Sequence, residues 1–178
     1  MQVLQFLIDT LFFFLIAACL LRAWMNIQRI RMAQQPGPFV MALTDWLVSP
    51  LRRVLPRRWA QSNIDTGSLL AAVLLGLVYG GVTWLVWANG EVASALGWVL
   101  SMGLRVLVRS ALQLLMLMVF AYAILSWVQP RSPVMYVLSH IVDPLIRPLR
   151  RVVPTIGGVD LSALVLIILA QIGLMLVG

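Results

Sequence analysis

The sequence predicts an all-α membrane protein of four transmembrane helices, arranged as two parallel repeats. Three observations predict this fold: the apolar composition, the long uncharged segments and an internal repeat. Hydrophobic residues make up 62% of the 178 residues and charged residues only 11%, against averages of about 45–50% and about 25% in soluble domains. A soluble chain of this length could not bury so much apolar surface. We therefore expect lipid to be the solvent for a large part of the chain.

Four apolar segments are predicted to cross the membrane, which takes about 20 mostly apolar residues in a helix. Residues 66–90, 110–130 and 161–178 contain no charged side chain. Residues 3–25 form the remaining predicted span, although Asp9 and Arg22 interrupt its apolar sequence. A cleaved signal peptide is the alternative for this first segment. Such a leader has basic residues before its apolar region, and here no Lys or Arg precedes the apolar residues.

An internal repeat divides the chain into residues 1–90 and 91–178. The sequence DWLVSPLRRVLP of residues 45–56 corresponds to DPLIRPLRRVVP of residues 143–154. Each repeat is predicted to contain a membrane helix, a basic segment with prolines and a second membrane helix. Because two crossings separate equivalent points, we expect parallel repeats related by an axis along the membrane normal.

The distribution of arginine predicts how the chain is oriented in the membrane. All 13 basic residues are arginine, and all but Arg105 and Arg109 lie in or beside the two basic segments. Cytoplasmic loops of membrane proteins carry an excess of Lys and Arg. We therefore expect both basic segments to be cytoplasmic and both chain termini to be periplasmic.

Each basic segment is predicted to form an amphipathic helix on the membrane surface, with its apolar face in lipid and its arginines among lipid phosphates. Pro50 and Pro148 lie inside these helices and are expected to bend them. The segments are predicted to bind anionic lipid or a membrane-protein partner through Arg52, Arg53, Arg147, Arg150 and Arg151. Two alternatives stay open: the segments only anchor the protein and fix its topology, or they dip into the membrane and return.

Most of the acidic residues are predicted to be structural. Asp143 followed by Pro144 is typical of a helix start, with a carboxylate N-cap and a proline at the first helical position. The same N-cap role is predicted for four aspartates: Asp45, Asp65, Asp143 and Asp160. Pairing with nearby arginines, which would hold the basic segments against the bundle, is the alternative.

Three charges and a stripe of small residues are predicted to act inside the bundle. Asp9 lies at a depth near that of Arg105 and Arg109, and a charge inside a membrane is costly unless it is paired. We therefore expect Asp9 to pair with Arg109 or Arg105; the alternative is that both arginines reach the outer headgroups. Small residues at four-residue intervals predict close packing within the bundle or between two copies of the chain. They are Ala72, Gly76 and Gly80.

The sequence contains no pattern typical of an enzyme, a cofactor site or a metal site. His140 is the single histidine and Cys19 the single cysteine, which indicates neither a metal cluster nor a disulfide framework. Nucleic acid is not expected as a partner, because the arginines are few on each face and lack stacking aromatic residues.

The second repeat resembles the YggT family, also called the YlmG-related family. The resemblance rests on residues 126–127, 143–151 and 154–162. The first repeat matches less fully, because Trp46 and Ser49 replace a proline and an arginine of the second. The resemblance implies a bacterial inner-membrane location and offers no catalytic residue to transfer. Family members are linked to osmotic or potassium tolerance, to cell division and nucleoid organisation and, in chloroplasts, to cytochrome assembly.

The sequence therefore predicts a non-enzymatic scaffold or accessory protein of the inner membrane. Its basic segments would bind anionic lipid, a membrane partner or both, in osmotic stress tolerance or in organisation of the envelope and of division. The alternative is a small transporter or channel component in osmotic or potassium homeostasis, which the charges inside the bundle favour. A homo-oligomer is compatible with both functions.

Overall fold

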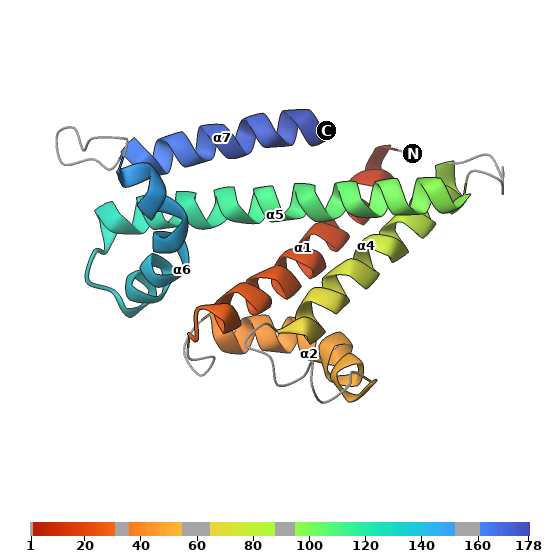
Figure 1. Ribbon diagram of the computed structural model, residues 1–178, viewed down its shortest axis with the longest axis horizontal. Helices are drawn as coiled ribbons and strands as arrows, with labels where there is room; N and C mark the ends of the chain where they lie inside the picture. Colours follow the sequence, from red (N-terminus) through yellow and green to blue (C-terminus); the bar gives the residue numbers. More distant parts are fainter. Residues whose placement is uncertain (1, 31–35, 55–64, 88–94, 152–160) are drawn as a thin grey trace.

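Every regular element in the described part of the chain is an α-helix. The computed structural model describes residues 2–30, 36–54, 65–87, 95–151 and 161–178. Its helices are α1 (Gln2–Ile27), α2 (Gly37–Val54), α4 (Thr66–Trp87), α5 (Ala95–Val128), α6 (Pro133–Arg150) and α7 (Leu161–Val177), as Figure 1 shows. The all-α prediction is confirmed for these residues.

Three helices, α1, α4 and α5, are long and apolar enough to cross a membrane. They coincide with the spans predicted over residues 3–25, 66–90 and 110–130, although α5 begins earlier, at Ala95. At about 1.5 Å per residue, the 34 residues of α5 reach well beyond the ~30 Å hydrocarbon core of a bilayer. Helix α7 carries no charge but has only 17 residues, so its length is just below that of a full span.

The outer faces of the long helices are covered with large apolar side chains. Phe6 and Phe14 of α1, Leu85 of α4 and Leu104 of α5 are all exposed. In water such a surface would cause aggregation, whereas lipid solvates it without cost. Together with the length of the helices, this surface is that of a membrane protein.

Helix α5 runs along the whole bundle, and the other long helices pack against it (Figure 1). Helices α1 and α4 lie side by side and cross α5 at an angle, while α7 packs along α5. Helix α2 packs against α1 and α4, and α6 packs against α5 and α7. In the described residues, both halves thus have the same order: a long apolar helix, a proline-containing helix and a second apolar helix.

The buried apolar side chains form two clusters, and α1 contributes to both. One cluster joins α1, α2, α4 and α5 through Ile16, Cys19, Val48, Ala71, Ala72, Leu75 and Val106. The other joins α1, α5, α6 and α7 through Ala17, Met25, Leu114, Met118, Val119, Val137, Ile141, Val142, Ile146 and Ala163. Because neighbouring residues of α1 face different clusters, this helix links the packing of the two halves.

The apolar face of α6 is covered by protein. Its buried residues belong to the second cluster and are Val137, Ile141, Val142 and Ile146. The indole Nε1–H of Trp24 donates to the main-chain oxygen of Ile141 at 3.0 Å, which ties α6 to the end of α1. The prediction that this apolar face lies in lipid is therefore wrong for α6. The physical reason is that α5 and α7 present apolar faces of their own, and close packing against them gains dispersion contacts.

Two of the predicted helix starts lie inside longer helices. Helix α6 begins at Pro133 and is capped by the side chain of Ser132, so Asp143 lies in its interior. Asp45 lies in the interior of α2. The prediction of N-caps at Asp45 and Asp143 is wrong, because a proline inside a helix removes one hydrogen bond without ending it where packing holds both sides. The internal prolines are Pro50, Pro144 and Pro148.

Helices α4 and α5 approach so closely that their main chains touch. A Cβ atom added to Gly76 would lie 2.9 Å from the main-chain oxygen of Gly103, and one added to Gly80 would lie 2.9 Å from the Cα of Val99. Ala72, one turn before Gly76, is buried in the first cluster. The stripe of small residues on α4 therefore packs within the chain, largely against α5.

Replacing Gly80 by alanine should destabilise the protein by about 1–3 kcal/mol, because the new Cβ would overlap the main chain of Val99. Gly81→Ala is the matched control, since nothing lies within 4 Å of its Cβ position and alanine is the better helix former. Thermal unfolding in mild detergent should show a lower midpoint for Gly80→Ala and an unchanged or higher midpoint for Gly81→Ala. Equal midpoints would contradict the close α4–α5 contact.

Candidate functional site

The basic residues of α6 lie on the face opposite its buried residues. The side chain of Arg147 is 74% exposed and that of Arg150 is 37% exposed. Arg151, at the end of the helix, is also exposed. The predicted segregation of arginines to one face is thus present, but on a helix whose other face is held by the bundle.

Asp143 organises these guanidinium groups. Its Oδ2 accepts from Nε of Arg147 at 2.9 Å, and its Oδ1 accepts from Nη1 of Arg150 at 2.8 Å. Nη2 of Arg150 also donates to the hydroxyl of Tyr122 on α5 at 3.1 Å. Three guanidinium groups against one carboxylate leave this surface positive. We name it the α6 basic face: Asp143, Arg147, Arg150 and Arg151.

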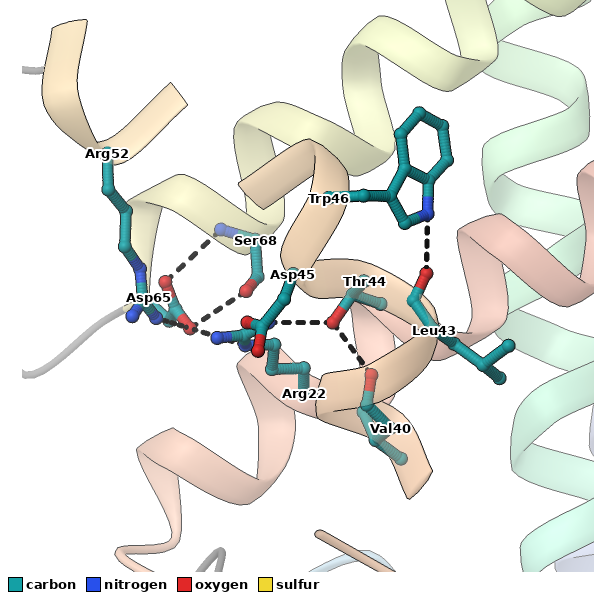
Figure 2. A network of polar contacts seen from close by, with 9 residues as sticks. All are labelled: Arg22, Val40, Leu43, Thr44, Asp45, Trp46, Arg52, Asp65 and Ser68. Carbon is teal, nitrogen blue, oxygen red and sulfur yellow. Dashed lines mark hydrogen bonds and ion pairs between the residues drawn. The ribbon is translucent and has the colours of Figure 1, made fainter. Parts of the chain in front are cut away.

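In the first half of the chain, the corresponding charges form a network around two buried side chains, Arg22 and Asp65 (Figure 2). Arg22, near the end of α1, has only 7% of its side chain exposed. Its Nη1 donates to Oγ1 of Thr44 and to Oδ1 of Asp45, both at 2.7 Å. Its Nε lies 3.9 Å from Oδ2 of Asp65. The arginine that interrupts the first apolar segment is therefore neutralised by two carboxylates, one inside α2 and one just before α4.

Asp65 is the centre of this network and precedes α4 directly. Its side chain is 3% exposed, and its Oδ2 lies 2.6 Å from Nη2 of Arg52. Ser68 donates to it twice, from the main-chain N–H at 3.1 Å and from the hydroxyl at 2.8 Å. The main-chain contact is that of an N-cap on the first turn of α4. Asp65 thus both caps α4 and pairs with arginine.

The electrostatics of Asp65 follow from these contacts. Burial by itself would raise its pKa, but the hydrogen bonds from Ser68 and the guanidinium of Arg52 outweigh it and hold the pKa below the ordinary value of 3.8. The carboxylate is therefore charged at neutral pH. Two carboxylates and two guanidinium groups balance one another, so the network stabilises the packing of α2 against α1 and α4.

The sequence reasoning missed three members of this network: Arg22, Thr44 and Ser68. A single arginine inside an apolar segment was the available signal, since such a charge requires a partner. Gly67 also contributes, because a Cβ there would lie 2.7 Å from Cγ of Arg52. Only the approach of α2 to the start of α4 brings these residues together.

The charges predicted inside the bundle gather around one cavity but do not form the expected pair. Oδ1 of Asp9 accepts from the hydroxyl of Tyr79 on α4 at 2.8 Å. Arg105 and Arg109 line the same cavity, yet in the described ranges no ion pair joins either of them to Asp9. The direct pair is therefore a wrong prediction. The physical reason is that α1 packs against α4, which places Tyr79 next to the carboxylate.

One predicted site residue, Asp160, lies outside the described residues. In the part of the chain that the structure describes, no three metal-ligating side chains cluster together. The chemistry that the arrangement offers is recognition of anions by guanidinium groups.

Comparison with known proteins places the chain in a family. The sequence profile of the CCB3/YggT family matches residues 1–86 and 101–178. The chain belongs to the CCB3/YggT family. The family resemblance of the second repeat is thereby confirmed, and it extends to the first half of the chain. No solved structure matches this sequence.

Relatives are similar over nearly their whole length. The "Uncharacterized protein in proC 3'region" of Vibrio alginolyticus is 37% identical over 179 residues, which cover 100% of this chain and 95% of the relative. The "Uncharacterized protein YggT" of Escherichia coli K12 is 35% identical over 173 residues, covering 97% and 87%. A protein of Haemophilus influenzae is 28% identical over 147 residues, covering 82% and 75%. None of these names refers to an enzymatic activity.

Asp65→Asn should destabilise the protein by about 3 kcal/mol, because Arg52 loses its ion-pair partner and the buried guanidinium of Arg22 keeps one carboxylate, Asp45, in place of two. Asp143→Asn is the matched control: this carboxylate is 31% exposed and pairs with arginines at the surface, so its loss should cost less than about 1 kcal/mol. Thermal unfolding in mild detergent measures both. Similar losses would show that burial of Asp65 does not distinguish the two networks.

Stability should also fall as the pH is lowered through the pKa of Asp65. Because the folded state holds this pKa below its unfolded value of 3.8, the stabilisation is complete above that value and is lost as pH decreases further. Unfolding midpoints between about pH 5 and pH 2 should decline less steeply in Asp65→Asn than in the unchanged protein. Parallel curves would contradict a lowered pKa.

Proposed function

We propose that this protein is a non-enzymatic scaffold or accessory protein of the inner membrane that binds anionic lipid, and a membrane-protein partner, with its basic helices. The observation that carries the proposal is the α6 basic face, which presents guanidinium groups on a helix whose opposite face is buried in the bundle. A helix that served only as an anchor would keep its apolar face free for lipid. This helix is instead a rigid support for charged side chains.

The geometry of the α6 basic face suits lipid phosphates. Guanidinium groups donate in a planar fork that matches the oxygens of a phosphate, and Asp143 orients two of them. Each arginine near an anionic membrane surface contributes on the order of 1 kcal/mol. Basic residues follow the ends of both α1 and α5, the first long helix of each half. This arrangement would place the basic residues of both halves at the same membrane surface.

The two basic helices contribute unequally in this proposal. In α2, Arg52 is bound to the buried carboxylate of Asp65, while Arg53 is exposed. In α6, the pairing carboxylate Asp143 lies on the exposed face itself. We therefore assign recognition mainly to α6, and structural support mainly to α2.

We further propose four membrane crossings and two parallel repeats, with the basic helices cytoplasmic and the termini periplasmic. The common element order of the two halves supports this arrangement. The two segments of the family match, 1–86 and 101–178, support it too, because they divide near the start of α5. Helix α7 would be the fourth span, uncharged and packed along α5. The cellular role proposed from the family resemblance is in osmotic stress tolerance or in envelope and division organisation.

Cysteine labelling tests the proposed topology. A membrane-impermeant maleimide should label Gly178→Cys on intact cells, but label Arg131→Cys only after the inner membrane is permeabilised. The native Cys19 is buried, and the unchanged protein serves as the control for its reactivity. Labelling of both positions from the same side would show that α7 does not cross.

Removing exposed charge from the α6 basic face should reduce bound anionic lipid. Arg147→Gln/Arg151→Gln should weaken the binding of anionic phospholipid in mild detergent by about thirtyfold, from roughly 1 kcal/mol for each of the two arginines. Lipid mass spectrometry, together with recovery of cross-linked membrane partners, provides the measurement.

Arg29→Gln/Arg131→Gln is the matched control, since it removes the same charge from exposed residues just after α1 and α5. It should retain most of the lipid. Equal losses in the two double variants would refute a specific site on α6. Ion-selective flux through the purified protein in vesicles would favour a transporter or channel component instead.

A further inference from the structure

A polar cavity opens at the surface of the bundle between helices, away from α2 and α6. It has a volume of about 230 Å³ and lies between α1, α4 and α5. The charged residues that line it are Asp9, Arg105 and Arg109, and its other polar residues include Tyr79, Ser110 and Gln113. Since Asp9 already accepts from Tyr79, two guanidinium groups face one engaged carboxylate. The cavity therefore has an excess of positive charge.

One buried group in this cavity lacks a partner. The hydroxyl of Ser110 is 1% exposed and forms no hydrogen bond within the described residues. Buried polar groups are nearly always hydrogen-bonded, so this hydroxyl is a donor available to a ligand. Arg105 and Arg109, one turn apart on α5, lie on the same side of that helix. Arg105, Arg109 and Ser110 thus line one space.

An apolar groove continues from the polar cavity. It has a volume of about 980 Å³ between α1, α5 and α7, and Phe13, Arg109 and Gln113 line both spaces. Apart from Gln171 and Gly178, its other walls are large and apolar, among them Met116, Leu117, Phe120, Ile167, Leu174 and Met175. Small residues characterise the packing of one membrane helix against another. Long flexible side chains suit an acyl chain better than a second helix.

We propose that the polar cavity and the apolar groove together bind an anionic phospholipid, with its phosphate at Arg105 and Arg109 and an acyl chain between α5 and α7. A lipid of net charge −1 neutralises the excess guanidinium group. A headgroup with hydroxyls, such as glycerol, can donate to the carboxylate of Asp9. The site is distinct from the α6 basic face, because it lies near the opposite ends of α1 and α5.

The test uses the full chain with Arg147→Gln/Arg151→Gln in the background, so that lipid on the α6 basic face does not contribute. Native mass spectrometry measures binding of phosphatidylglycerol, with phosphatidylethanolamine, phosphatidylcholine and free glycerol phosphate as comparison ligands. Phosphatidylglycerol should bind at least several-fold more tightly than the other two lipids. Free glycerol phosphate should bind far more weakly, because it does not fill the groove.

Two pairs of variants separate the headgroup from the chain. Arg109→Gln should weaken binding about tenfold, as expected for loss of a charge-assisted hydrogen bond, while Arg29→Gln should not. Leu117→Trp fills the groove and should weaken binding, whereas Leu104→Trp, on an exposed part of α5 outside the groove, should not. Arg105→Gln provides a second headgroup variant if Arg109→Gln does not fold.

Three outcomes would overturn the proposal: equal affinity for all three lipids, binding of glycerol phosphate as tight as that of the lipid, or no difference within the variant pairs. The background variant keeps this test separate from that of the α6 basic face. Loss of binding at one site leaves the prediction for the other unchanged.

Discussion

Where α4 crosses α5, the main chains of Gly76 and Gly103 meet with no side chain between them. This contact sets the register of the two helices. Tyr79 follows Gly76 by about one turn, and Arg105 follows Gly103 closely, so the contact brings the hydroxyl and the guanidinium to the same cavity. Helix α1 packs on both helices and adds Asp9. Larger residues at the crossing would separate the polar groups that line this cavity.

The two basic helices show how one sequence motif can have two structural roles. In the first half, Arg22 extends from α1 into the space beside α2, and Asp45 and Asp65 neutralise it there. When Trp24 is aligned with Trp127, the second half has Leu125 at the position equivalent to Arg22. Asp143 pairs instead with arginines of its own helix. A buried guanidinium requires a carboxylate partner, because removing its charge from water costs several kcal/mol, by order of magnitude. An exposed guanidinium keeps its hydration and does not carry this cost. In our proposal, Asp143 orders the arginines of an anion-binding face.

Lipid acts on this protein both as a solvent and, in our proposals, as a ligand. The exposed phenylalanine and leucine side chains of the long helices require an apolar surrounding. The same surrounding makes an unpaired guanidinium costly, which favours phosphate as its partner at either end of the bundle. In our proposals, anion recognition would thus follow from placing arginine beside apolar helices, and it would need no catalytic group.

The sequence by itself determined the class of the fold. Uncharged segments of about 20 residues have few alternatives to membrane helices, so α4 and α5 were predictable. Helix α1 was predictable from its apolar composition despite Asp9 and Arg22, as was the segregation of arginine on α6. The N-cap at Asp65 was predictable too, because the residue directly precedes an apolar helix. The positions of Asp45 and Asp143 inside α2 and α6 were not predictable, because local rules cannot show that packing extends a helix past an internal proline. The partners of Arg22, Asp9 and the apolar face of α6 come from helices far away in the sequence. Only the tertiary structure decided these contacts, since they depend on how the helices pack against one another.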